Sequence, residues 1–230
     1  MNKEKRYEIF RRLREDNPHP TTELNFSSPF ELLVAVTLSA QATDVGVNKA
    51  TDKLFPVANT PEAIYALGVD GLSEYIKTIG LFNSKARNVI AACKILIEQH
   101  NSQVPDNREA LEALPGVGRK TANVVLNTAF GQPTMAVDTH IHRVSLRLAL
   151  IGPKVSADEA HDVLERAIAP DLVFGFHVYV INHGRRICKA QRPLCGHCVL
   201  SSRCPSWALY AKPGDDREPE PGLLYDPALP

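Results

Sequence analysis

The chain of 230 residues is long enough to build one large domain or two smaller ones around a buried core. Its hydrophobic content of 44%, charged content of 23% and formal net charge of zero are ordinary for a folded protein and exclude a disordered chain. No apolar run is long enough to cross a membrane and the first residues lack the apolar core of a signal peptide, so we expect a cytoplasmic protein with no membrane partner.

Helix signals dominate the chain and strand signals are scarce, which predicts an all-α fold. The charged stretch 2–16 predicts a first helix, which Asn17-Pro18 ends. Ser28 before Pro29 predicts the start of an apolar helix over 29–39. Thr60-Pro61 repeats this pattern, and Gly68 ends the short helix that it begins.

Helical spacing of apolar residues predicts another helix over 84–100, with Cys93 on its core face. Further along, Ser156 and Glu159 form a capping box, which predicts a helix that stops at Pro170. The segment 172–181 is rich in Val and Phe, but no hairpin partner accompanies it, so we interpret it as a buried helix.

The C-terminal part of the chain is uneven in charge. Residues 212–230 hold five acidic and two basic side chains with five prolines, and predict a disordered tail. The other 211 residues therefore carry three more basic than acidic side chains. Between residues 172 and 214 there are six basic side chains and no acidic one, so this stretch is either a contact for a polyanion or a solvated basic face.

The segment Leu114–Lys120 reads Leu-Pro-Gly-Val-Gly-Arg-Lys and lies between predicted helices at about 107–113 and about 119–130. Gly116 and Gly118 permit a tight turn that a Cβ would obstruct. Such a turn leaves backbone N–H groups at the positive end of the second helix, where they suit a phosphate oxygen, and Arg119 adds charge. A plain turn between two helices is the alternative.

Lys120 falls in the first turn of the second helix, where the helix dipole repels an ammonium group. The same repulsion favours the neutral amine, which is the form that a nucleophile requires. Lys120 is therefore a candidate nucleophile, and the alternative is a second cation that binds phosphate.

Gly131-Gln132-Pro133 breaks the helix that contains Lys120, so the chain can turn back and begin a new helix with Asp138 at its N-cap. An ionised carboxylate at this position suits the stabilisation of an electron-poor sugar carbon. A cap with no chemical role is the alternative, because Asp is a preferred N-cap residue.

Cys188, Cys195, Cys198 and Cys204 fall within 17 residues, with 6, 2 and 5 residues between them. Four thiols so close together favour a metal over disulfides in an intracellular chain. Four thiolates are the ligand set of a zinc site and also of a 4Fe–4S cluster, and the spacing alone decides only weakly between them.

The segment LPGVGRKTA followed by VDTH resembles the helix–hairpin–helix, Gly/Pro…Asp superfamily of DNA glycosylases, and the resemblance covers about residues 1–210. The lysine places the chain with the endonuclease III branch, whose members are bifunctional enzymes for damaged pyrimidines. The resemblance implies an all-α protein of two lobes. One is a six-helix barrel at 22–133 with the helix–hairpin–helix at about 107–130, and the other is a cluster domain formed by 1–21 and 134–211.

The resemblance also implies which residues form the site. Lys120 and Asp138 would be catalytic, and the four cysteines would hold one 4Fe–4S cluster, with zinc as the minority alternative. The expected DNA contacts are Gly116, Val117, Gly118 and Arg119 in the hairpin, His140 and Arg143 after the aspartate, Lys189 and Arg192 in the first cysteine loop, and the gap-filling Gln41 and Leu81.

The function implied is the removal of oxidised pyrimidines from double-stranded DNA. Cleavage of the resulting abasic site would follow by β-elimination through a lysine Schiff base, carried out by a monomer at the nucleoid in the cytoplasm. A monofunctional mismatch glycosylase of the same superfamily and a non-catalytic DNA-binding module are the two alternatives.

Overall fold

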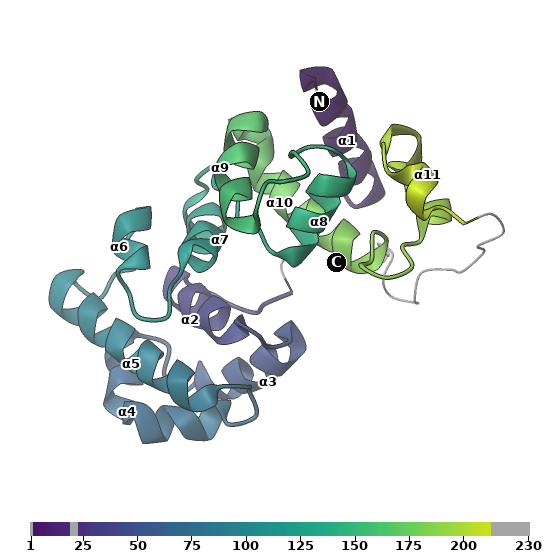
Figure 1. Cartoon of the computed structure of the whole chain (residues 1–230). Helices are drawn as coiled ribbons and strands as arrows, with labels where there is room; N and C mark the ends of the chain where they lie inside the picture. The colour runs from purple at the N-terminus through teal and green to yellow at the C-terminus, as the bar shows by residue number, and fades with distance from the viewer. Residues whose placement is uncertain (1, 19–22, 213–230) are drawn as a thin grey trace. The chain divides into compact units, whose positions relative to one another are not determined.

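In the computed structural model, residues 2–18 and 23–212 are described (Figure 1). These residues form helices joined by turns and contain no β-strand, which confirms the predicted all-α fold. The chain divides into two compact units, one of Thr22–Ala136 and one of Met1–Thr21 with Val137–Pro230. Among the described residues, no helix has the length and apolar character needed to span a membrane. The predicted tail, apart from its first residues, lies outside the described part of the chain.

The unit of residues 22–136 is built around one buried helix. Its described helices are α2 (Pro29–Ser39), α3 (Asp44–Leu54), α4 (Pro61–Ile76), α5 (Phe82–Gln99), α6 (Arg108–Glu112) and α7 (Arg119–Phe130). Nine of the 11 residues of α2 are buried, and α3, α5 and α7 pack against it. The Ser28 side chain caps α2 and Pro29 occupies its first turn, as predicted, because proline has no N–H that the helix start would leave unpaired.

Helix α4 has a break inside it. Gly68 has a φ of +66°, a left-handed conformation that ends the first helical stretch, so the predicted end at Gly68 is confirmed. A second stretch follows at once, and its Leu72 and Ile76 are buried in the core of this unit. Cys93 on α5 is also buried there, which confirms its predicted place in the core.

The second unit joins the N-terminal helix to the C-terminal half of the chain. Its described helices are α1 (Lys3–Asp16), α8 (Thr139–Arg147), α9 (Ala157–Ala167), α10 (Pro170–Arg186), the 3₁₀ turns Cys195–His197 and Ser201–Arg203, and α11 (Trp207–Tyr210). Helix α10 packs against α1 and α8, and the rings of Phe10 and Tyr179 meet edge to face with centroids 5.4 Å apart.

Two predictions of local structure are confirmed in this unit. The segment 172–181 lies inside α10 and is helical, as interpreted from its lack of a hairpin partner. Both hydrogen bonds of the capping box are present at the start of α9, between Ser156 and Glu159. Helix α9 ends at Ala167, and Pro170 then begins α10, because the first helical position tolerates proline.

Candidate functional site

The sequence predicts that a Cβ would obstruct the turn between α6 and α7 at both of its glycines. The structure confirms this for Gly116 and not for Gly118. Gly116 has a φ of +80°, and a Cβ there would lie 3.0 Å from side-chain atoms of Asn88, so no other residue fits without strain. The same prediction is wrong at Gly118, where φ is −94° and a Cβ would meet no atom within 4 Å. What Gly118 provides instead is open space over the N-cap backbone, where a ligand can approach closely.

The first turn of α7 offers backbone donors. In the described structure no side chain caps this helix, so its first N–H groups are not taken by a capping residue. The Val117 side chain is buried and anchors the turn, which leaves only its backbone to face a ligand. Arg119 is half-buried, and Lys120 is exposed in the first turn of α7, where the sequence predicts it.

Two buried asparagines on α7 hold the segment that follows this helix. Nδ2 of Asn123 donates to the Met135 carbonyl at 2.9 Å, and Nδ2 of Asn127 donates to the Thr134 carbonyl at 3.0 Å. The Thr134 hydroxyl donates in return to the Asn123 carbonyl at 2.7 Å. The chain therefore runs back along α7 after the break at 131–133, as predicted, and Asp138 follows three residues after Met135.

Asp138 is the N-cap of α8, as predicted. Its Oδ1 accepts the backbone N–H of Ile141 at 2.7 Å, and the side chain is half-buried. This hydrogen bond satisfies one of the helix donors that would otherwise be unpaired, and it restricts the orientation of the carboxylate.

The two expected phosphate contacts on α8 are bonded to each other. Nη2 of Arg143 lies 3.0 Å from Nδ1 of His140. Because arginine can only donate, Nδ1 of His140 accepts, and the N–H of the neutral ring lies on Nε2. Arg143 also donates to the carbonyls of Gly184 and Cys188, at 2.8 and 3.0 Å. Arg143 therefore braces α10 and the first cysteine, and its contact with phosphate stays a prediction.

Three of the predicted DNA contacts have strained backbones. Gln41, Leu81 and Arg192 have φ angles of 54°, 61° and 50°, and all three residues are exposed. Only six non-glycine residues in the described part of the chain have a positive φ, so half of them fall at predicted contacts. A leucine with this backbone and a side chain 60% exposed gains little from packing, and strain of this kind is common in functional segments.

The four cysteines of the C-terminal region line one small cavity, together with Arg147 and His183. The pKa of the Cys198 thiol is raised to about 12, mainly because the thiol is buried and also because the other three cysteines repel its thiolate. Four thiolates so close together need a cationic partner, and a metal centre supplies one. Among the described residues, no group of three or more Cys, His, Asp or Glu side chains is arranged to hold a metal ion. The metal centre therefore rests on the donor set and not on an assembled coordination geometry.

Arg147 holds the first cysteine loop. Its Nη1 donates to Sγ of Cys188 at 3.3 Å and to the Lys189 carbonyl at 2.8 Å, and its guanidinium lies 4.1 Å from the ring centroid of Tyr210. A buried arginine in this position keeps the cysteine loop close to α8 and α11.

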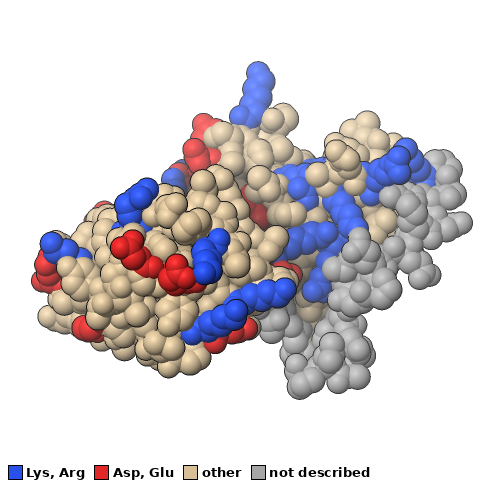
Figure 2. Space-filling model, turned by 90° about the horizontal axis from the view of Figure 1, so that it is seen from below, with Lys and Arg blue, Asp and Glu red and all other residues tan. Residues whose placement is uncertain are grey.

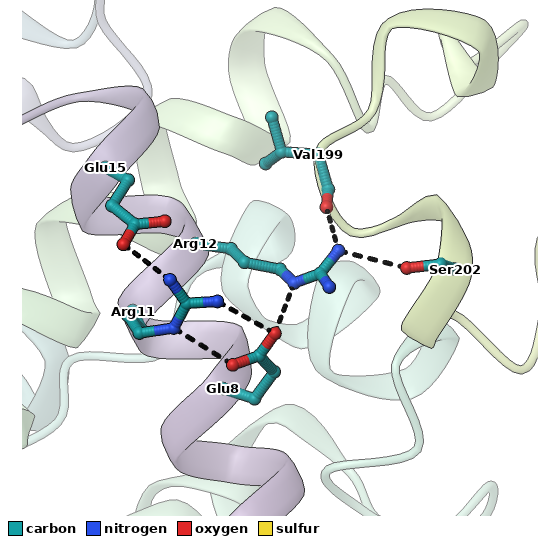
Figure 3. Close-up of polar contacts among 6 residues, drawn as sticks. All are labelled: Glu8, Arg11, Arg12, Glu15, Val199 and Ser202. Atoms are coloured by element: carbon teal, nitrogen blue, oxygen red, sulfur yellow. Dashed lines mark hydrogen bonds and ion pairs between the residues drawn. The ribbon is translucent and has the colours of Figure 1, made fainter.

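Arg12 holds the last cysteine loop from the opposite end of the chain (Figure 3). Its Nη1 donates to the Val199 carbonyl at 3.1 Å and to the Ser202 hydroxyl at 3.0 Å. Its Nε donates to Glu8 at 2.7 Å, which keeps the guanidinium turned toward the loop between Cys198 and Cys204. The N-terminal helix is thus attached directly to the segment that carries the last two cysteines.

The stretch of residues 172–212, which contains the four cysteines, has basic side chains and no acidic one. Figure 2 shows Lys and Arg side chains gathered on the right-hand part of the face in view, with few acidic side chains among them. Lys189 is half-buried and Arg192 is exposed, both in the loop between the first two cysteines. A surface of this charge attracts polyanions such as DNA.

Residues 34–170 match the family described as HhH-GPD superfamily base excision DNA repair protein, which is more than half of the chain. The chain belongs to this family. The HhH-GPD match contains the glycine turn, Lys120 and Asp138 together with Gln41 and Leu81, whereas the four cysteines follow its end.

Named relatives and solved structures agree with the HhH-GPD assignment. The chain is 62% identical over 204 residues to endonuclease III of Escherichia coli (strain K12), a match of 89% of this chain and 96% of that protein. It is also 62% identical to endonuclease III of Haemophilus influenzae (strain ATCC 51907 / DSM 11121 / KW20 / Rd), with the same coverage. The solved structure of a trapped endonuclease III–DNA covalent intermediate, an estranged-adenine complex, has a TM-score of 0.85 and 41% identity, covering 91% of this chain and 98% of that chain. A thermostable thymine-DNA glycosylase shares the fold, with a TM-score of 0.81.

Sequence reasoning missed the side chains that hold this HhH-GPD site in place. They are Asn123 and Asn127 on α7, Arg147 on α8 and Arg12 on α1. Two weak signals were available, because the two asparagines interrupt the apolar face of α7 at a spacing of four residues and Arg147 follows Arg143 at the same spacing. No local pattern pointed to Arg12.

Proposed function

We propose that this chain is a bifunctional DNA glycosylase and abasic-site lyase of base excision repair, which removes oxidised pyrimidines from duplex DNA. The observation that carries the proposal is the presence of Lys120 in the first turn of α7 and Asp138 at the N-cap of α8, in a chain 62% identical to endonuclease III. Neither a monofunctional mismatch glycosylase nor a non-catalytic module is favoured, because the relatives at 62% identity are named endonuclease III.

Lys120 is the proposed nucleophile. Its neutral Nζ attacks C1′ of the damaged nucleotide, and the bond from C1′ to the base breaks, so that the base leaves with the electron pair and gains a proton. The adduct then loses one amine proton, the C1′–O4′ bond breaks and O4′ takes up a proton, which opens the sugar ring and leaves a protonated Schiff base between Nζ and C1′. Removal of a proton from C2′ then expels the 3′ phosphate oxygen, which breaks the strand on the 3′ side of the lesion.

Asp138 is the proposed electrostatic and proton-accepting partner. Its ionised carboxylate stabilises the positive character that develops at C1′ as the base departs, and it accepts the proton that the amine loses on attack. One carboxylate oxygen is held by the N–H of Ile141, which supports a fixed orientation for the other.

The remaining site residues are proposed to hold and open the duplex. The damaged nucleotide must leave the helix, which costs a few kcal/mol of lost stacking. We assign Gln41 and Leu81 to the gap that it leaves, supported by their exposed and strained backbones. The hairpin residues 116–119 and the side chains of His140, Arg143, Lys189 and Arg192 are assigned to the phosphate backbone.

For the metal centre we propose one 4Fe–4S cluster bound by Cys188, Cys195, Cys198 and Cys204, within a cluster domain of residues 1–21 and 134–211. When bound, the cluster supplies a rigid cross-link between the cysteine loops, and it takes no part in the bond-breaking steps. Four thiols that line one cavity, in loops held by Arg147 and Arg12, supply the donor set of this group. We assign residues 22–133 to the barrel domain and the site of action to the nucleoid in the cytoplasm.

Borohydride trapping tests the nucleophile. The wild-type chain incubated with a duplex that contains thymine glycol, an oxidised pyrimidine, should form a covalent protein–DNA adduct when borohydride reduces the Schiff base. Lys120→Gln should abolish the adduct, whereas Lys94→Gln, which changes an exposed lysine on α5, should leave it unchanged. Adduct formation by the Lys120 variant would refute the assignment, and base release without nicking by the wild type would identify a monofunctional enzyme.

Metal analysis of the purified protein tests the cofactor. We expect a yellow-brown protein with about four irons per chain, because a 4Fe–4S cluster uses all four thiolates. A colourless protein that contains one zinc ion and no iron would overturn this part of the proposal and leave the glycosylase assignment unaffected.

A further inference from the structure

Lys85 on α5 is a lysine in an unusual place. Only 6% of the residue is exposed, although an ammonium group loses much of its hydration when it is buried. Its Nζ donates to the Leu38 carbonyl at 2.8 Å, and no carboxylate within the described residues forms an ion pair with it. Burial also lowers its pKa, which is the expected sign for an ammonium group that is short of solvent. Because the loss of hydration costs free energy, a lysine at this position needs a structural or functional explanation.

One explanation lies at the C-terminal end of α2. The last carbonyls of a helix carry partial negative charge, and basic residues in the last turn usually stabilise them. Helix α2 has no basic residue in its last turn. The Ser39 hydroxyl donates to the Val36 carbonyl, and the Ala42 N–H donates to the Ser39 carbonyl. The Leu38 carbonyl accepts from Lys85, which lies on α5.

The backbone of Lys85 lies in the first turn of α5, which directly follows Leu81. Leu81 is the N-cap of this helix, with a left-handed backbone and no side-chain cap. The backbone N–H of Lys85 donates to the Leu81 carbonyl at 3.1 Å, and the Ser84 hydroxyl donates to the same atom at 2.9 Å. Lys85 is therefore bonded to Leu81 through its backbone and to the end of α2 through its side chain.

The end of α2 and the start of α5 lie next to the two residues with strained backbones. Gln41 lies two residues beyond the end of α2, and Leu81 directly precedes α5. The segments also approach each other, since a Cβ built on Gly80 would lie 3.8 Å from the Gln41 carbonyl oxygen, an ordinary van der Waals distance. Lys85 therefore joins the end of α2, which precedes Gln41, to the first turn of α5, which follows Leu81.

We propose that Lys85 is a positioning residue that couples the Gln41 and Leu81 segments, so that both enter the DNA together when a damaged nucleotide is extruded. This inference rests on the proposed function, which assigns these two residues to the gap. Without the ammonium group, the carbonyl end of α2 loses its cation and the two segments move independently. Gln41 or Leu81 can then be absent from the gap when the nucleotide is extruded. The chemistry at Lys120 is unaffected.

Lys85→Met tests the coupling, because methionine keeps most of the apolar stem and removes the charge. We expect excision of thymine glycol from a duplex to fall about tenfold to a hundredfold, the usual cost of a misplaced group. Cleavage of an abasic site in single-stranded DNA, which has no gap to fill, should be unchanged. Lys85→Arg should restore part of the duplex activity, and Lys94→Met on the exposed face of α5 should match the wild type on both substrates.

Fluorescence of 2-aminopurine placed beside the lesion reports extrusion directly, since unstacking increases its emission. The increase seen when the wild type binds should be lost with Lys85→Met and retained with Lys94→Met. An unchanged fluorescence increase with Lys85→Met would overturn the proposal. Equal losses of Lys85→Met activity on the duplex and on the single strand would also overturn it, because a general destabilisation would affect both.

Hydrogen exchange of the wild-type chain tests the same coupling if Lys85→Met does not fold. On binding a duplex with a tetrahydrofuran abasic analogue, residues 39–43 and 78–84 should gain protection together and to a similar degree. Protection of one segment without the other would refute the coupling. If the wild type neither excises nor nicks damaged DNA, the proposed function fails, whereas the exchange result tests only whether the two segments move together.

Discussion

Replacing Asp138 by asparagine separates the structural role of this residue from its proposed chemical one. Asp138 accepts the N–H of Ile141 at 2.7 Å, and asparagine caps helices about as well as aspartate. The substitution therefore loses only the favourable charge at the start of α8, worth about 0.3–1 kcal/mol. At about 2–4 °C per kcal/mol for a protein of this size, the apparent Tm should fall by about 1–4 °C.

Asp138→Ala removes the cap as well as the charge, which should destabilise the protein by about 1–2 kcal/mol. The apparent Tm should then fall by about 2–8 °C. Both variants lose the carboxylate, so single-turnover excision of thymine glycol from a duplex should slow by about 10²–10⁴-fold in each, the usual contribution of a proton-transfer group. The two variants should therefore differ in Tm, because only the alanine variant loses the cap, while their excision rates should be similarly low.

Ser156→Ala is the matched control, since Ser156 caps α9 in the same unit and has no proposed contact with DNA. It should lower the apparent Tm by an amount similar to Asp138→Ala and leave the excision rate unchanged. A wild-type excision rate for Asp138→Asn would refute the chemical role. So would excision rates that simply follow the Tm across the three variants.

Three further predictions concern the contacts that hold the site. Asn127→Leu leaves the buried Thr134 carbonyl unpaired and should cost about 1–3 kcal/mol in urea unfolding; an unchanged midpoint would contradict this. Arg12→Met should speed the loss of iron to a chelator, whereas Arg11→Met, whose residue bonds only to acidic side chains of α1, should not; equal rates would remove the role of Arg12. Arg11 and Arg12 lower the pKa of Glu8 from 4.5 to about 2, so its stabilising contribution is present above pH 4.5 and declines as the pH falls toward about 2. Glu8→Gln should flatten the dependence of Tm on pH over that interval, and an unaltered curve would count against the network.

Local structure in this chain follows closely from local sequence. The caps at Ser28, Asp138 and Ser156 begin helices where the sequence predicts them, because a side-chain oxygen within three residues of a free N–H needs no distant partner. The position of Lys120 in the first turn of α7 is predictable for the same reason. The glycine turn shows the limit of local reasoning, since Gly116 is required by its contact with Asn88, which lies on another helix, and Gly118 is not required by space or by φ.

The sequence by itself determined the helices, the residues that begin them and the chemical groups of the candidate site, through short-range hydrogen bonds and the resemblance carried by its motifs. Only the tertiary structure decided how these groups are held. Lys85, Asn123 and Arg12 each donate to a backbone carbonyl far along the chain, at Leu38, Met135 and Val199. Every residue has such a carbonyl, and packing alone decides which of them lack a partner, so the acceptor of each bond cannot be read from the sequence.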